Sequence, residues 1–146
     1  MDRYDKERLV EIVLYVLNKT GELDYYTLLK TIYFAELKHL AKWGQRITAD
    51  DASEDASNIM LPLRQANEDY LSESEKEALD ASIQENASLS FEQLKNKSHD
   101  KIWQKNYREG KSKKVIATMD LAESAHASEA MKEYIKENLE IERALA

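Results

Sequence analysis

Cysteine is missing from this 146-residue sequence, and turn residues are rare, with three glycines and one proline. The absence of cysteine excludes thiolate metal sites, cysteine nucleophiles and disulfide frameworks, and it is typical of a reducing compartment. Because turn residues are so few, loops must be short and helices must dominate, whereas a β-sandwich would need many more of them. The sequence therefore predicts a mainly α fold, and its length fits one domain over residues 1–146.

Long apolar runs are also missing. The longest covers only six residues, Ile12 to Leu17, and acidic residues precede it. The sequence thus predicts neither a signal peptide nor a membrane span, and we expect a cytoplasmic protein with no membrane partner. The net charge of −7 is uneven, because residues 51–90 carry 10 acidic and only 2 basic side chains.

Apolar residues repeat at steps of three and four along most of the chain, which predicts a compact helical domain of about five to six helices. At most a short β element is expected near residues 58–63, around the only proline, Pro62. Capping residues predict the helix boundaries. The first helix runs from Tyr4 to Lys19 and ends at Gly21, and the second lies between Asp24 and Gly44. Capping boxes start two further helices, at Ser72/Glu75 and at Ser90/Gln93, Ser98 is expected to cap a segment that ends at Gly110, and Ser128 precedes a last helix to about Arg143.

A carboxylate and an imidazole, Glu36 and His39, stand three residues apart on the second predicted helix. This spacing puts both side chains on one face, where some helical bundles hold a metal ion. A dinuclear site needs a second such pair and two further glutamates. His99 has no acidic residue three positions before it, and the pair Glu123 and His126 lies outside the predicted helices. We therefore expect no metal and no cofactor, and we interpret the pair as a half-buried histidine with a glutamate on the polar edge of the helix. A metal-dependent enzyme using Glu36 and His39 remains the alternative.

Two other patterns have simple structural interpretations. Ser98, His99 and Asp100 are consecutive, and neighbouring helical side chains diverge, so they do not form a catalytic triad. Between Lys95 and Lys114 there are eight basic and two acidic residues, with Trp103 and Tyr107 among them. Such a stretch could meet nucleic-acid phosphates, but a solvated face or an acidic protein partner suits this acidic chain better. Residue chemistry thus indicates surfaces rather than a reaction centre.

The order of three motifs is more informative than any one of them. The strings "LLKTIYFAELKHLAKWGQRITADD", "YLSESEKEALDASIQENASLSFEQLKNKSHDKIWQK" and "MDLAESAHASEAMKEYIKE" resemble, in this order, the SocA-like or Panacea domain family of bacterial and phage antitoxins. The resemblance covers most of residues 8–137. The family pattern falls here on Leu28, Leu29, Lys30, Tyr33, Phe34, Ala35, His39, Leu40 and Gly44, then on Leu71, Ser72 and Glu75, then on Ser98, His99 and Trp103.

The resemblance implies a helical antitoxin that neutralises a cognate protein toxin by direct contact, with no catalytic residues. One branch of the family acts instead as an adaptor that hands its toxin to a protease, which is the main alternative. Affinity is expected to come from a few aromatic or aliphatic anchors. Tyr25, Tyr26 and Trp43 are the candidate partner-binding residues, whereas we expect mainly structural roles for His99 and Trp103.

The stretch "TADDASEDASN", residues 48–58, departs from the family pattern. Family members continue here into an extended segment, a proline-containing turn and a further helix. Either this protein lacks that helix, or the sequence joins two segments across residues that are missing between about Thr48 and Asn58. The acidic, apolar-poor composition of this atypical join favours the second explanation.

Overall fold

A computed structural model describes residues 2–48, 59–99 and 117–145. In these ranges the chain forms six α-helices, one 3-10 turn and one pair of two-residue strands, so the prediction of a mainly α fold is confirmed. No helix among the described residues has the length and apolarity that crossing a bilayer requires. The elements are α1 (Arg3–Thr20), β1 (Leu23–Asp24), α2 (Tyr25–Trp43), β2 (Ile59–Met60), η1 (Glu68–Tyr70), α3 (Glu73–Asn86), α4 (Phe91–Ser98), α6 (Thr118–Ser124) and α7 (Glu129–Leu145).

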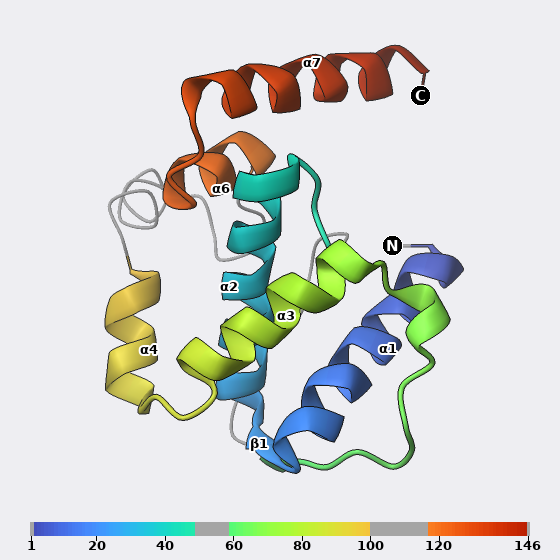
Figure 1. The fold of residues 1–146 in the computed structure, drawn as a ribbon, viewed down its shortest axis with the longest axis vertical. Coiled ribbons are helices and arrows are strands. Elements are labelled where there is room, and N and C mark those ends of the chain that lie inside the picture. The colour runs from blue at the N-terminus through green and yellow to red at the C-terminus, as the bar shows by residue number, and fades with distance from the viewer. Residues whose placement is uncertain (1, 49–58, 100–116, 146) are drawn as a thin grey trace.

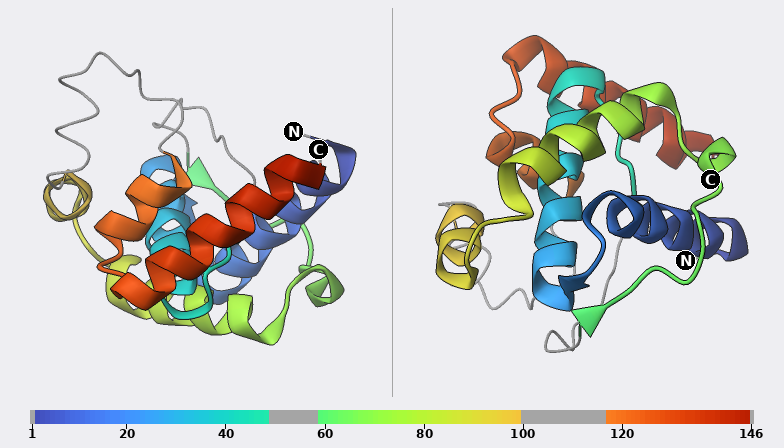
Figure 2. Two further views of the ribbon diagram at one scale, coloured as in Figure 1. Left: turned by 90° about the horizontal axis from the view of Figure 1, so that it is seen from above. Right: turned by 60° about the horizontal axis from the view of Figure 1, so that its bottom comes forward.

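Helix α2 is the central element. Helix α3 crosses in front of it, α1 and α4 lie on its two sides, and α6 and α7 lie at its C-terminal end (Figure 1). The two further views in Figure 2 agree with this arrangement. Both ends of α2 form as predicted. The Asp24 side chain accepts the Thr27 amide at 3.0 Å, and Gly44 ends the helix at φ 72°, a left-handed conformation suited to glycine.

Reciprocal capping fixes the starts of the next two helices. Ser72 accepts the Glu75 amide while the Glu75 carboxylate accepts the Ser72 amide at 2.8 Å, and Ser90 and Gln93 repeat this exchange before α4. Both boxes were predicted, and each satisfies backbone donors that a helix N-terminus leaves open. The Ser128 hydroxyl likewise accepts the Met131 amide at the start of α7, as predicted.

The β element is the antiparallel pair β1–β2, which joins Leu23 to Met60 and Asp24 to Ile59. Strand β2 falls within the predicted range, and it ends before Pro62, which lacks the N–H that a ladder needs. Strand β1 was not predicted, because only two residues separate Gly21 from the cap of α2. The pair ties the α1–α2 turn to the chain that leads into α3.

The described residues form two apolar clusters. The main cluster joins α1, α2 and α3, and the second joins the C-terminal half of α2 to α6 and α7. The buried members of the first are Ile12, Tyr15, Val16, Leu17, Leu28, Ile32, Ala35, Ile47, Leu71, Ala78 and Leu79, and those of the second are Leu40, Leu121, Ala122, Ala127 and Ile135. Helix α7 buries one side chain fully, Ile135, so most of its surface faces away from the core.

Ser98 is the last residue of α4, and its hydroxyl donates to the Lys95 carbonyl at 3.1 Å. The segment that we predicted it to cap lies outside the described residues. Residues Thr118–Ser124 form the helix α6, for which the sequence offered no capping signal, because no side chain caps its start at Ala117. The atypical join after Thr48, the segment closed by Gly110 and the candidate residue Trp103 lie outside the described residues.

Glu11 ties the chain before α3 to α1. Its buried carboxylate accepts Arg64 Nη1 and Nη2 at 2.9 and 2.8 Å and the Asn67 amide at 2.7 Å. The Arg64 hydrogen bond is the largest influence on the pKa of Glu11, which lies below its ordinary value of 4.5 although burial opposes the shift. A bidentate pair of this kind fixes direction as well as distance.

The lowered pKa of Glu11 predicts acid sensitivity. Because the folded state holds the ionised form, this group's contribution to stability is present above pH 4.5 and is lost as the pH falls through the folded-state pKa. We expect Glu11→Gln to show a shallower loss of unfolding free energy between pH 5 and pH 3 than the wild type. Urea unfolding at each pH measures this slope. Arg64→Ala should flatten it similarly, and slopes equal to the wild type in both variants would contradict the assignment.

Candidate functional site

Glu36 is a buried carboxylate that holds the chain segment after α2. It is 3% exposed and accepts Arg46 Nε at 2.6 Å. It also accepts the amides of Ile47 and Thr48, each at 3.0 Å. A charge buried this deeply requires such donors, because water does not replace them. The side chain therefore stabilises a turn 10 to 12 residues later in the sequence.

His39 holds the same segment from one turn further along α2. It is also 3% exposed, and its Nδ1 lies 2.7 Å from the Gln45 carbonyl. Nδ1 carries a proton there, since a carbonyl oxygen only accepts. Its Nε2 lies 2.9 Å from the Ser74 hydroxyl, in the first turn of α3. The ring thus bridges the chain after Gly44 to a separate helix.

Arg8 completes this arrangement from α1. Its Nη1 donates to the Ile47 carbonyl at 2.7 Å, its Nε donates to the Tyr70 carbonyl at 3.1 Å, and its Nη2 pairs with Glu75 at 2.6 Å. We call Glu36, His39, Arg8 and Ser74 the α2 clamp. Both backbone groups of Ile47 are held by it, and the Ile47 side chain is buried in the main cluster.

The α2 clamp changes the interpretation of the Glu36/His39 pair. The sequence suggested a half-buried histidine and a glutamate on the polar edge, but both side chains are buried. Their polar atoms are engaged by neighbouring parts of the chain. Within residues 2–48, 59–99 and 117–145, no group of three or more His, Cys, Asp or Glu side chains is placed to hold a metal ion. The pair is well explained as a structural support.

The other motif residues gather where α2 meets α4. Lys30 Nζ lies over the rings of Tyr26 and Tyr33, 5.4 and 5.5 Å from their centroids, and burial lowers the pKa of this lysine. At the end of α4, burial is the main cause of a lowered pKa at His99, and the charges of Lys30 and Lys95 add to it. Buried Ser98 forms a hydrogen bond with Tyr26, whose pKa is raised by burial. These residues join two helices, as a structural role requires.

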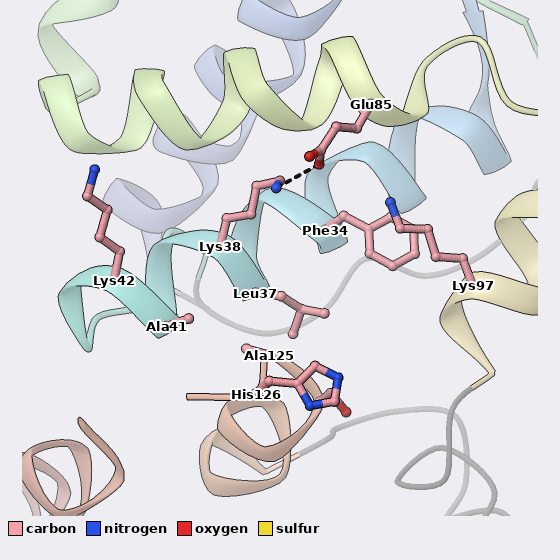
Figure 3. Close-up of a pocket in the computed structure, with 10 residues that line it drawn as sticks. Phe34, Leu37, Lys38, Ala41, Lys42, Glu85, Lys97, Ala125 and His126 are labelled. Carbon is pink, nitrogen blue, oxygen red and sulfur yellow. Dashed lines mark ion pairs between the residues drawn. The ribbon is translucent and has the colours of Figure 1, made fainter. Parts of the chain in front are cut away.

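A shallow groove of about 530 Å³ lies between α2, α3, α4 and α6. In Figure 3, Leu37 and Ala41 on α2 face Ala125 and His126 across it, and Lys97 lies over the ring of Phe34. That ammonium is 4.4 Å from the ring centroid, and Lys38 pairs with Glu85 at 2.6 Å. The lysines at the rim therefore have partners within the chain. Among the described residues that line it, the groove has an apolar floor and no cluster of catalytic groups.

The candidate partner-binding residues differ in exposure. Tyr25 packs against the main cluster, and Tyr26 contacts Phe91 with ring centroids 4.6 Å apart. Trp43, at the end of α2, is 47% exposed. Sequence reasoning missed three further exposed side chains on α7, namely Tyr134, Ile141 and Leu145. The apolar spacing of α7 was visible in the sequence, but which part of that stripe packs inward depends on the tertiary arrangement.

Leu29 and Gly44 occupy structural positions. Leu29 is half-buried on α2. Gly44 lies under α7, because a Cβ built on it would come within 2.7 Å of the Tyr134 ring and 2.9 Å of the Met131 sulfur. Gly44 therefore ends α2 and also provides the space for α7, a second role that the sequence does not reveal.

Comparison of the chain with protein-family models, curated proteins and solved structures found no match.

The α2 clamp predicts a large cost for removing Glu36. Glu36→Ala leaves the amides of Ile47 and Thr48 without their carboxylate acceptor, so we expect a loss of about 3 kcal/mol in the free energy of unfolding. Urea denaturation followed by tryptophan fluorescence measures it. Glu85→Ala is the matched control, because its surface ion pair with Lys38 contributes only about 0–1 kcal/mol. Equal losses of unfolding free energy in the two variants would contradict the structural role of the clamp. Elemental analysis would also contradict it if the purified protein held stoichiometric iron, manganese or zinc that is lost in His39→Ala.

The contact of Gly44 with Tyr134 predicts energetic coupling between the two positions. We expect Gly44→Ala to destabilise the protein by about 1–2 kcal/mol through its positive φ alone. The collision with the ring adds about 1–3 kcal/mol. In a Tyr134→Ala background the cost should fall to the backbone cost plus that of the close approach to the flexible Met131 side chain. A double-mutant cycle of urea midpoints tests this, and additive effects would show that the ring does not rest on Gly44.

Proposed function

We propose that this protein is a cytoplasmic antitoxin that neutralises a protein toxin by direct contact. The first support is the order of three sequence motifs that resembles the SocA-like or Panacea antitoxin domains. The described residues of these motifs form helix α2, the turn after it that Glu36 and His39 hold, the start of α3, and the contact between α4 and α2. Motifs with structural roles of this kind suit a scaffold shared by proteins that differ in their partners.

The second support is the use of the polar residues. Glu36 and His39, the pair with the best spacing for chemistry, both bind other parts of the chain. A side chain held this way stabilises a fold and has little freedom to act on a substrate. This use of the pair favours a binding role over the metal-dependent enzyme.

The observation that carries the proposal is the set of large apolar side chains on the surface near the C-terminal end of α2 and along α7. Trp43, Tyr134, Ile141 and Leu145 are all exposed. Aromatic and aliphatic anchors dominate the affinity of protein interfaces, and neighbouring exposed ones mark binding surfaces. A neutralising contact with a toxin would bury them.

Co-expression with the products of adjacent genes tests this function. We expect one product to arrest growth when induced alone and to be harmless with this protein, and the two should copurify. Unchanged toxin levels during rescue favour neutralisation by binding, whereas falling levels that a protease deletion restores favour an adaptor. Absence of toxicity from either neighbour, or toxicity that this protein fails to relieve, contradicts the proposal.

A further inference from the structure

The exposed apolar residues of α7 lie on one line. Tyr134, Asn138, Ile141 and Leu145 are separated by steps of four, three and four residues, which is the spacing of a helix–helix seam. We call these four residues the α7 seam. Tyr134 is 45%, Ile141 56% and Leu145 82% exposed. Met131, Ile135 and Leu139 pack instead in the second apolar cluster, so α7 is attached by a neighbouring face. Tyr134 rests on Gly44 at one end of the seam, and the other end, Ile141 and Leu145, is exposed.

The seam is about 16 Å long, since 11 residues of helix separate its ends. That length matches three turns of a partner helix. Figure 1 shows that the C-terminal half of α7 extends beyond α6 and the end of α2. Tyr134 rests on Gly44, so the N-terminal end of the seam adjoins the C-terminal end of α2.

Charge determines which kind of helix fits. Glu137 and Glu142 occupy the positions that flank the seam on its two sides, and both are exposed. In a parallel pair of two α7 helices, Glu137 of one copy would face Glu142 of the other. In an antiparallel pair, Asn138 would lie opposite Ile141 and its amide would be buried without a partner. A second copy of this chain therefore fits poorly in either orientation.

We propose that the α7 seam docks an amphipathic helix of the toxin that carries lysine or arginine on both sides of its apolar stripe. This inference rests on the proposed function and specifies its interface. Basic side chains of the partner helix pair with Glu137 and Glu142, and its apolar residues cover Ile141 and Leu145. A polar residue of the partner faces Asn138, which fixes the register of the two helices.

The test uses the toxin that the wild-type protein relieves in co-expression. We expect the double variant Ile141→Asp/Leu145→Asp to lose growth rescue and to bind the purified toxin at least tenfold more weakly. The charge-reversal variant Glu137→Lys/Glu142→Lys should also bind at least tenfold more weakly, and its affinity should no longer fall with added salt. Leu63→Asp is the matched control, because Leu63 is 95% exposed and lies outside the seam.

The remaining outcomes separate this inference from the proposed function. Circular dichroism and the unfolding midpoint should stay near wild-type values in all three variants, because each side chain is exposed. Rescue by the wild type together with full affinity in the seam variants overturns the inference and leaves the antitoxin function intact. A wild-type dimer that Ile141→Asp breaks also overturns it, because a second copy would then occupy the seam. If the wild type rescues growth from neither neighbouring product, both proposals fail.

Discussion

The buried carboxylate of Glu36 is the constraint on which the arrangement of the first three helices depends. A carboxylate in this position needs donors, and the chain after α2 supplies them only if it turns back at Gly44. That turn places Ile47 in the main cluster, where Arg8 of α1 donates a hydrogen bond to the Ile47 carbonyl. His39 then links the same turn to Ser74 of α3. Helices distant in sequence are thus oriented by one short segment.

Features encoded locally could be predicted from the sequence. The cap at Asp24, the stop at Gly44 and the two capping boxes each need only residues within four positions of one another, so their patterns indicate the helix ends directly. The mainly helical fold follows from the same evidence. Ser98 shows the limit of this reasoning, because the sequence did not reveal that this residue also ends α4.

The candidate site could be predicted only in part, because its partners are far apart in the sequence. Spacing placed Glu36 and His39 on one face of a helix, but it did not show that the face is buried or that Arg8 and Ser74 approach it. Arg8 lies 39 positions from Ile47, and Ser74 lies 35 positions from His39. Only the packed fold brings these groups together. In it, Glu36 and His39, whose spacing resembles half of a metal site, hold the chain after α2.

The attachment of α7 separates the residues that hold this helix on the fold from those that remain exposed. Ile135 is the one fully buried side chain of α7, and Gly44 supplies the space in which Tyr134 rests. Because Gly44 also begins the turn held by Glu36, the position of α7 depends on the same turn that orients α1 and α3. The exposed residues at 141 and 145 contribute little to this attachment. Substitutions there should therefore change the exposed surface of α7 without removing contacts that stabilise the fold.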